Sequence, residues 1–77
     1  MNTIVFVEDD AEVGSLIAAY LAKHDMQVTV EPRGDQAEET ILRESPDLVF
    51  IDIMLPGKEG MTICRDLRAK WSGPLVL

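Results

Sequence analysis

Two short apolar runs constrain the fold of this chain more than any other feature of its sequence. Residues 4–7 (Ile-Val-Phe-Val) and residues 48–51 (Leu-Val-Phe-Ile) are continuous and rich in β-branched side chains. Neither run shows the polar alternation of a strand that has one face in water. Strands of this kind are buried on both faces, which is typical of a parallel sheet with helices on either side. We therefore expect an α/β fold.

The segment after the first run predicts a helix followed by a second strand. Residues 11–24 indicate a helix with one core face, because apolar residues recur there at three- and four-residue steps: Val13, Leu16, Ile17, Tyr20 and Leu21. Asp9 and Glu12 have the spacing of a capping box at the start of that helix. Residues 26–31 then alternate between apolar and polar side chains, as in a strand with a more exposed face.

The remainder of the chain predicts two more helices and the beginning of a fourth strand. Asp35 and Glu38 have the spacing of another capping box, and the weaker helix that follows ends before Pro46. Residues 75–77 begin a strand after a Ser-Gly-Pro stop. The core face of the last helix is predicted to consist of Ile63, Cys64, Leu67 and Trp71.

The resulting order is βαβαβαβ, with connections long enough to hold helices. That order predicts a single domain with a parallel sheet, right-handed crossovers and helices on both faces, a three-layer α/β/α arrangement. The sheet is expected to stop after the beginning of its fourth strand, because the sequence stops there.

Charge and composition exclude several classes of function. Seven Lys and Arg against fourteen Asp and Glu give a net charge of −7, which repels nucleic-acid backbones and anionic membranes. We expect no direct nucleic-acid binding by this segment. No apolar stretch is long enough to span a bilayer, and the N-terminus does not resemble a signal peptide. A lone cysteine, Cys64, fits a reducing compartment, so a cytoplasmic location is expected.

Acidic side chains directly follow both buried runs. Glu8, Asp9 and Asp10 follow the first, and Asp52 follows the second. In open parallel sheets, ligands bind beyond the carboxyl ends of the strands where the strand order reverses, so these acids are expected to share one cleft. Two carboxylates about 5 Å apart repel by roughly 3 kcal/mol at an effective dielectric constant near 20. The repulsion is relieved either when one carboxyl takes up a proton or when a cation sits among them. All-oxygen ligands favour Mg²⁺, with Mn²⁺ and Ca²⁺ as alternatives.

A purely structural interpretation stays open at this point. Asp9 and Asp10 are also well placed to cap the first helix, and a lone Asp at a strand end is often simply solvated. A metal site is favoured because both acidic stretches follow strands that are expected to be adjacent.

These residues resemble a known family. Val7-Glu8-Asp9-Asp10 and residues 47–60 (Asp-Leu-Val-Phe-Ile-Asp-Ile-Met-Leu-Pro-Gly-Lys-Glu-Gly) strongly resemble response-regulator receiver domains. The Glu-Asp-Asp start and the Met-Leu-Pro-Gly stretch look like the OmpR/PhoB subfamily of transcriptional regulators. The resemblance implies a flavodoxin-like (CheY-like) fold, and it covers the whole chain, which would form the first two thirds of a receiver domain.

The resemblance also implies roles for individual residues. Asp52 matches the phosphoacceptor, and Asp9 matches a direct ligand of Mg²⁺. Glu8 matches the acid that reaches the metal through water, and Met54 matches the position whose backbone carbonyl binds it. Asp10 matches a less regular acidic position. A two-component phosphoprotein of this kind takes its phosphoryl group from a sensor histidine kinase and is not a turnover enzyme.

The chain lacks some parts that the resemblance implies. The family uses a Thr or Ser after its fourth strand and a Lys after its fifth, and the sequence ends before both of them and before any DNA-binding domain. An apolar strand at residues 75–77 without a neighbour is an unpaired sheet edge. We therefore expect self-association or domain swapping of this chain.

Three other functions fit the sequence to different degrees. A phosphohydrolase with an aspartate nucleophile would need an Asp-x-Asp pair, but Met54 stands two positions after Asp52. A nucleotide- or flavin-binding domain would need a phosphate-binding loop where Glu8 and its neighbours stand. The serious alternative is a non-catalytic folding fragment or engineered building block that keeps an acidic metal pocket.

Overall fold

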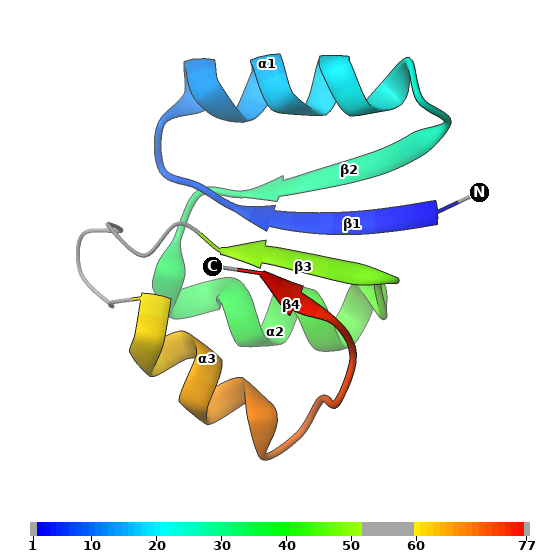
Figure 1. The fold of residues 1–77 in the computed structure, drawn as a ribbon. Helices are drawn as coiled ribbons and strands as arrows, with labels where there is room; N and C mark the ends of the chain where they lie inside the picture. The colour runs from blue at the N-terminus through cyan, green and yellow to red at the C-terminus, as the bar shows by residue number, and fades with distance from the viewer. Residues whose placement is uncertain (1, 52–59, 77) are drawn as a thin grey trace.

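The computed structural model describes residues 2–51 and 60–76, which form a parallel sheet with helices on both faces (Figure 1). The strands lie in the order β2-β1-β3-β4. This arrangement confirms the predicted three-layer α/β/α fold. The elements are β1 (Asn2–Val7), α1 (Ala11–Ala22), β2 (Met26–Glu31), a 3-10 turn (Gly34–Gln36), α2 (Ala37–Glu44), β3 (Leu48–Ile51), α3 (Gly60–Arg68) and β4 (Leu75–Val76).

The two central strands, β1 and β3, pair in register over four residues, from Ile4 opposite Leu48 to Val7 opposite Ile51. β2 and β4 flank this pair, which leaves one sheet edge at β2 and the other at β4. β1 is buried on both faces from Ile4 to Val7, as expected of a strand without polar alternation. β3 is fully buried only on the face that points to α2 and α3, and its other face, with Phe50, is half-buried.

The main core lies between the sheet and the pair of helices α2 and α3, on the lower side in Figure 1. Alternate residues of the central strands point into it, and each helix adds one apolar face. Trp71 and Leu75 pack against its border. The fully buried members are Val5, Val7, Ala37, Ile41, Val49, Ile51, Ile63 and Leu67.

Helix α1 covers the opposite face of the sheet, and it approaches β2 closely. A Cβ added at Gly14 would lie 2.9 Å from Cγ1 of Val30, so the absence of a side chain at Gly14 allows this distance. The predicted core face of α1 is wrong in part, because Leu16 is 65% exposed and Tyr20 is 60% exposed. Only the side of the helix that carries Gly14 faces β2 closely.

The start of α2 also differs from the prediction. Asp35 does not cap the helix; its carboxylate pairs with the Arg33 guanidinium at 2.7 Å inside the 3-10 turn. The N-cap position is Gln36, which makes no side-chain capping bond. The Arg33 pKa is raised because its guanidinium bonds to and is attracted by the Asp35 carboxylate. The Arg33 ion pair therefore takes the carboxylate that the predicted capping box would need.

A clamp at the end of α3 fixes the entry into β4. Trp71 lies beyond the helix and not on its core face, and a Cβ at Gly73 would overlap the indole ring. The Arg68 guanidinium donates to the carbonyl oxygen of Gly73 at 2.7 Å and lies over the indole. Lys70 pairs with Glu38 of α2 at 2.6 Å, and the hydrogen bond and charge of that carboxylate raise the Lys70 pKa.

Candidate functional site

The candidate site begins where the central strands end. Val7 and Ile51 are paired neighbours, and both are fully buried. Glu8 follows Val7 directly, so the acidic stretch of residues 8–10 leaves the sheet beside the carboxyl end of β3. This is the edge at which parallel sheets bind ligands.

Glu8 is a buried carboxylate, with only 6% of its surface exposed. Its backbone N–H donates to the carbonyl oxygen of Glu31 at 3.0 Å, which continues the pairing with β2 by one residue. Its Oε1 accepts a hydrogen bond from the backbone N–H of Asp10 at 3.0 Å. The backbone that follows therefore fixes the direction of this carboxylate, which leaves it oriented rather than solvated.

Asp9 and Asp10 are both exposed, but they have different roles in the fold. Asp10 is the N-cap of α1, and its Oδ1 accepts hydrogen bonds from the N–H groups of Glu12 at 3.0 Å and Val13 at 3.2 Å. The predicted box of Asp9 and Glu12 is therefore wrong by one residue. Since Asp10 holds the helix, the Asp9 side chain is not needed as a cap and remains the accessible acid.

A fourth acid at the same edge, Glu31, was not predicted from the sequence. Glu31 ends β2 opposite Val7, and its Oε1 accepts a short bond of 2.6 Å from the buried hydroxyl of Thr40. Its Oε2 accepts from the backbone N–H of Arg33 at 2.9 Å. Both oxygens thus hold the connection from β2 to α2, which makes Glu31 a positioning residue. The signal in the sequence was an acid that ends the second strand.

Two predicted site residues, Asp52 and Met54, lie outside the described residues. Within residues 2–51 and 60–76, no group of three or more His, Cys, Asp and Glu is arranged to hold a metal ion. The described part of the edge supplies the oriented carboxylate of Glu8 and the accessible carboxylate of Asp9. Hard oxygen donors of this type fit Mg²⁺.

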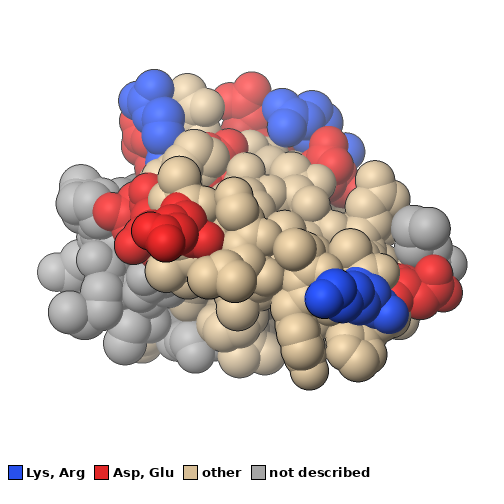
Figure 2. Space-filling model, turned by 90° about the horizontal axis from the view of Figure 1, so that it is seen from above, with Lys and Arg blue, Asp and Glu red and all other residues tan. Residues whose placement is uncertain are grey.

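Acidic side chains gather at this end of the molecule. Figure 2 shows Asp and Glu side chains grouped at the left, where α1 begins, whereas most of the surface between them and the far end of the molecule carries no charge. The candidate site is therefore the acidic end of a largely uncharged face. A site of this kind attracts cations, and it repels phosphate groups unless a cation intervenes.

Comparison with known proteins identifies the family. Residues 4–77 match the model of the response regulator receiver domain. The chain belongs to the response-regulator receiver family. The receiver fold and the receiver resemblance predicted from the sequence are thereby confirmed.

Individual relatives support this assignment. The chain is 94% identical over all 77 residues to the transcriptional regulatory protein RstA of Escherichia coli K12, of which it spans 32%. It superposes with a TM-score of 0.92 on the BeF3-activated receiver domain of Klebsiella pneumoniae RstA, at 76% identity. The superposition covers 96% of this chain and 63% of the K. pneumoniae chain. The non-phosphorylated HemR receiver of Leptospira biflexa matches with a TM-score of 0.83 at 26% identity, over 91% of this chain and 56% of that one.

None of the helices found in residues 2–51 and 60–76 combines the length and apolar character that a bilayer span requires.

The two neighbouring acids can be separated by experiment. We expect Asp10→Ala to lower the free energy of unfolding by about 1 kcal/mol, because two N–H groups of α1 lose their acceptor. Asp10→Ser keeps a capping oxygen and is expected to restore most of that loss. Urea unfolding followed by circular dichroism measures both changes.

Asp9→Ala is the matched control, because it removes a carboxylate from the adjacent position without removing the cap. Its free energy of unfolding should equal or exceed that of the unaltered chain, since one source of repulsion is removed. Equal destabilisation by Asp9→Ala and Asp10→Ala would contradict this division of roles.

Proposed function

We propose that this receiver accepts a phosphoryl group on Asp52 from a sensor histidine kinase. Mg²⁺ binds at the acidic edge, by which we mean the carboxyl ends of β1 and β3, where Glu8 and Asp9 leave the sheet. The pairing of Val7 with Ile51 carries the proposal, because it brings the strand before Glu8 and Asp9 beside the strand that precedes Asp52 in the sequence. Carboxylates from two distant parts of the chain are then available to one ion.

The proposed metal ligands are oxygen atoms throughout. Asp9 binds Mg²⁺ directly, and Glu8, whose direction is fixed by the Asp10 N–H, binds it through water. Asp52 and the backbone carbonyl of Met54 complete the protein ligands. When bound, Mg²⁺ supplies the positive charge that offsets the carboxylates and the phosphoryl oxygens, and Mn²⁺ is a chemically similar substitute.

The proposed reaction is a single phosphoryl transfer. A carboxylate oxygen of Asp52 attacks phosphorus, and the P–N bond of the donor phosphohistidine breaks. The electron pair of that bond returns to the imidazole, which takes up a proton. The product is an aspartyl phosphate that stays on the chain, so the receiver is a signal acceptor and not a turnover enzyme. The BeF3-activated state of the K. pneumoniae relative supports the assignment, because BeF3 mimics a phosphoryl group.

The wider role is proposed from the relatives. The E. coli relative is named a transcriptional regulatory protein, and the present chain spans about a third of it. We infer that phosphorylation of this receiver regulates transcription in the full-length protein, in the cytoplasm, where kinase and receiver meet.

Labelling with a small phosphodonor tests the proposal. Incubation with acetyl phosphate and Mg²⁺ is expected to add the mass of one phosphoryl group to the intact chain. Asp52→Asn should abolish this gain, and Asp9→Ala should reduce it strongly, because the ion loses a direct ligand. Intact-mass spectrometry under cold, neutral conditions gives the readout.

The controls separate the proposal from its main alternative. Asp47→Asn removes a carboxylate at the amino ends of β1 and β3, where it accepts a hydrogen bond from Thr3, far from the acidic edge. It should leave labelling unchanged. Absence of labelling under conditions that phosphorylate the K. pneumoniae receiver would contradict the proposal and favour a folding unit without a switch.

The exposed apolar stripe of α1 is proposed to contact the kinase. Val13, Leu16 and Tyr20 lie on one side of the helix at three- and four-residue spacing, and all three are exposed. The surface in Figure 2 shows few charges beside the acidic end. Exposed apolar stripes next to a reactive site mark protein contacts, and a kinase helix that carries phosphohistidine would fit along this one.

Leu16→Glu tests this contact. It should slow transfer from a phosphorylated histidine kinase by about tenfold or more, because a charge replaces a central apolar contact. Labelling by acetyl phosphate should stay the same, since the acidic edge is unchanged. Ser15→Glu places the same charge on another side of α1 and serves as the control. An equal effect of both variants would contradict the proposed contact.

Self-association is proposed to occur through β4. Its two residues pair with β3, and no strand of the described chain lies on its outer side. Val76 is 46% exposed, so an apolar side chain accompanies the unpaired backbone. Edges of this type pair with other chains, either by simple docking or by exchange of elements.

Sedimentation velocity over a wide range of concentration tests this association. We expect a concentration-dependent dimer that Val76→Lys disrupts, because a charge at an edge strand opposes pairing. Gln27→Lys adds the same charge at the β2 edge and should leave the dimer in place. A monomer at every concentration would overturn the proposal.

A further inference from the structure

The second edge of the sheet, at β2, lacks the lysine, proline or bulge that often prevents pairing. β2 pairs with β1 over six consecutive residues without a bulge, and its outer side has no neighbouring strand in the described structure. Proteins usually protect such edges with lysine, proline, bulges or short strands. β2 (Met26–Glu31) is of ordinary length and contains neither lysine nor proline.

The backbone direction of β2 follows from one hydrogen bond. The carbonyl oxygen of Glu31 accepts from the N–H of Glu8, so the polar groups of Glu31 face β1. Backbone groups alternate in direction along a strand. The outward-facing N–H and C=O groups therefore belong to Met26, Val28 and Val30, and they offer donors and acceptors to a further strand.

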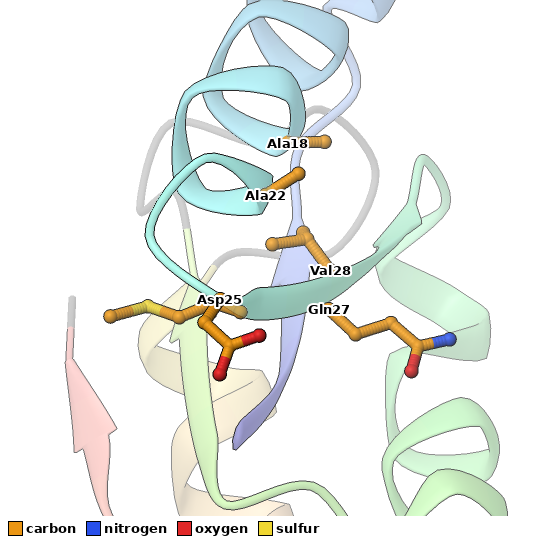
Figure 3. A pocket seen from close by; sticks show the side chains of 6 residues that line it. Ala18, Ala22, Asp25, Gln27 and Val28 are labelled. Carbon is orange, nitrogen blue, oxygen red and sulfur yellow. The ribbon is translucent and has the colours of Figure 1, made fainter. Parts of the chain in front are cut away.

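A groove runs beside this edge at its beginning, below the second half of α1 (Figure 3). Its volume is about 510 Å³, and small side chains on α1 leave it open. Gln27 and Val28 point to opposite faces of β2, yet both line the groove, so the groove extends around the free edge of the strand. The lining residues are Ala18, Ala22, Asp25, Met26, Gln27 and Val28.

We propose that the free edge of β2 and this groove bind an extended segment of another protein that alternates apolar and basic residues. The outward backbone groups pair with the segment, and the groove takes its apolar side chains. This site is independent of phosphoryl transfer, because its pairing groups belong to Met26, Val28 and Val30, and none of these residues is among the acids at the carboxyl ends of the strands.

Charge decides between a foreign segment and a second copy of the chain. Asp25 lines the groove, and the whole chain carries a net charge of −7, so a basic segment is attracted. A second copy paired antiparallel through the same outward groups, with Val28 opposite Val28, would place Glu31 of each chain opposite Asp25 of the other. Like charges would then meet at both ends of the added strand, which disfavours self-pairing.

Hydrogen exchange with a defined peptide tests the site. The probe is an acetylated and amidated hexapeptide of alternating valine and lysine, and its counterpart replaces lysine with glutamate. The valine–lysine peptide is expected to slow exchange at the amides of Met26, Val28 and Val30. The amides of Gln27 and Thr29 already face β1 and should change little. This alternating pattern is specific to an added strand.

Variants of the groove complete the test. Ala22→Leu fills the groove and should weaken binding of the valine–lysine peptide at least about fivefold, whereas Ala19→Leu, on the same helix outside the groove, should not. Asp25→Asn removes the charge, and asparagine tolerates the positive φ of 63° at this position. Because the charge is lost, binding should weaken about twofold, and the effect should be larger at low salt.

Three outcomes would overturn the proposal. One is unchanged exchange at Met26, Val28 and Val30 with saturating peptide. Another is equal binding of the glutamate peptide. The third is protection of the same three amides without peptide as the chain concentration rises, which would assign the edge to a second copy.

Discussion

The pairing of β1 with β3 is the constraint on which the rest of the structure depends. It joins segments more than forty residues apart, and closing so long a loop costs conformational entropy before any contact forms. The cost is offset by burial of apolar side chains on both faces of β1 and on the core face of β3. Because both strands end at the same edge, the pairing that creates the core also determines where the acidic residues emerge.

The carboxylates at the acidic edge have two kinds of role: some hold the fold, and another is available to bind a ligand. Asp10 caps α1, Glu31 holds the connection to α2, and Glu8 is held by a backbone N–H. Among the described acids at this edge, Asp9 is the one whose side chain is not needed to hold a turn or a helix. A site built in this way keeps its shape when the charge on one member is altered, since the neighbouring turns are fixed by other carboxylates.

Sequence reasoning predicted those elements whose signal is local. The ranges of β2 and β3 match the predicted strands, because burial pattern and β-branched content act over four to six residues. The predicted cap at Asp35 failed because Arg33, two residues away, competes for its carboxylate. The predicted core face of α1 was wrong in part, because helical periodicity locates apolar residues without showing which of them a sheet covers. The roles of Asp52 and Met54 stay predictions from family resemblance.

The clamp at Trp71 has a consequence for spectroscopy of this receiver. The single tryptophan is held against Gly73 and Arg68 where β4 begins, and the Pro74 carbonyl there accepts from the N–H of Val49 near the amino end of β3. The acidic edge lies at the other end of that strand. Intrinsic fluorescence therefore reports whether α3 and β4 stay packed together around Trp71. An ion that binds at the acidic edge without loosening this packing leaves the emission spectrum unchanged.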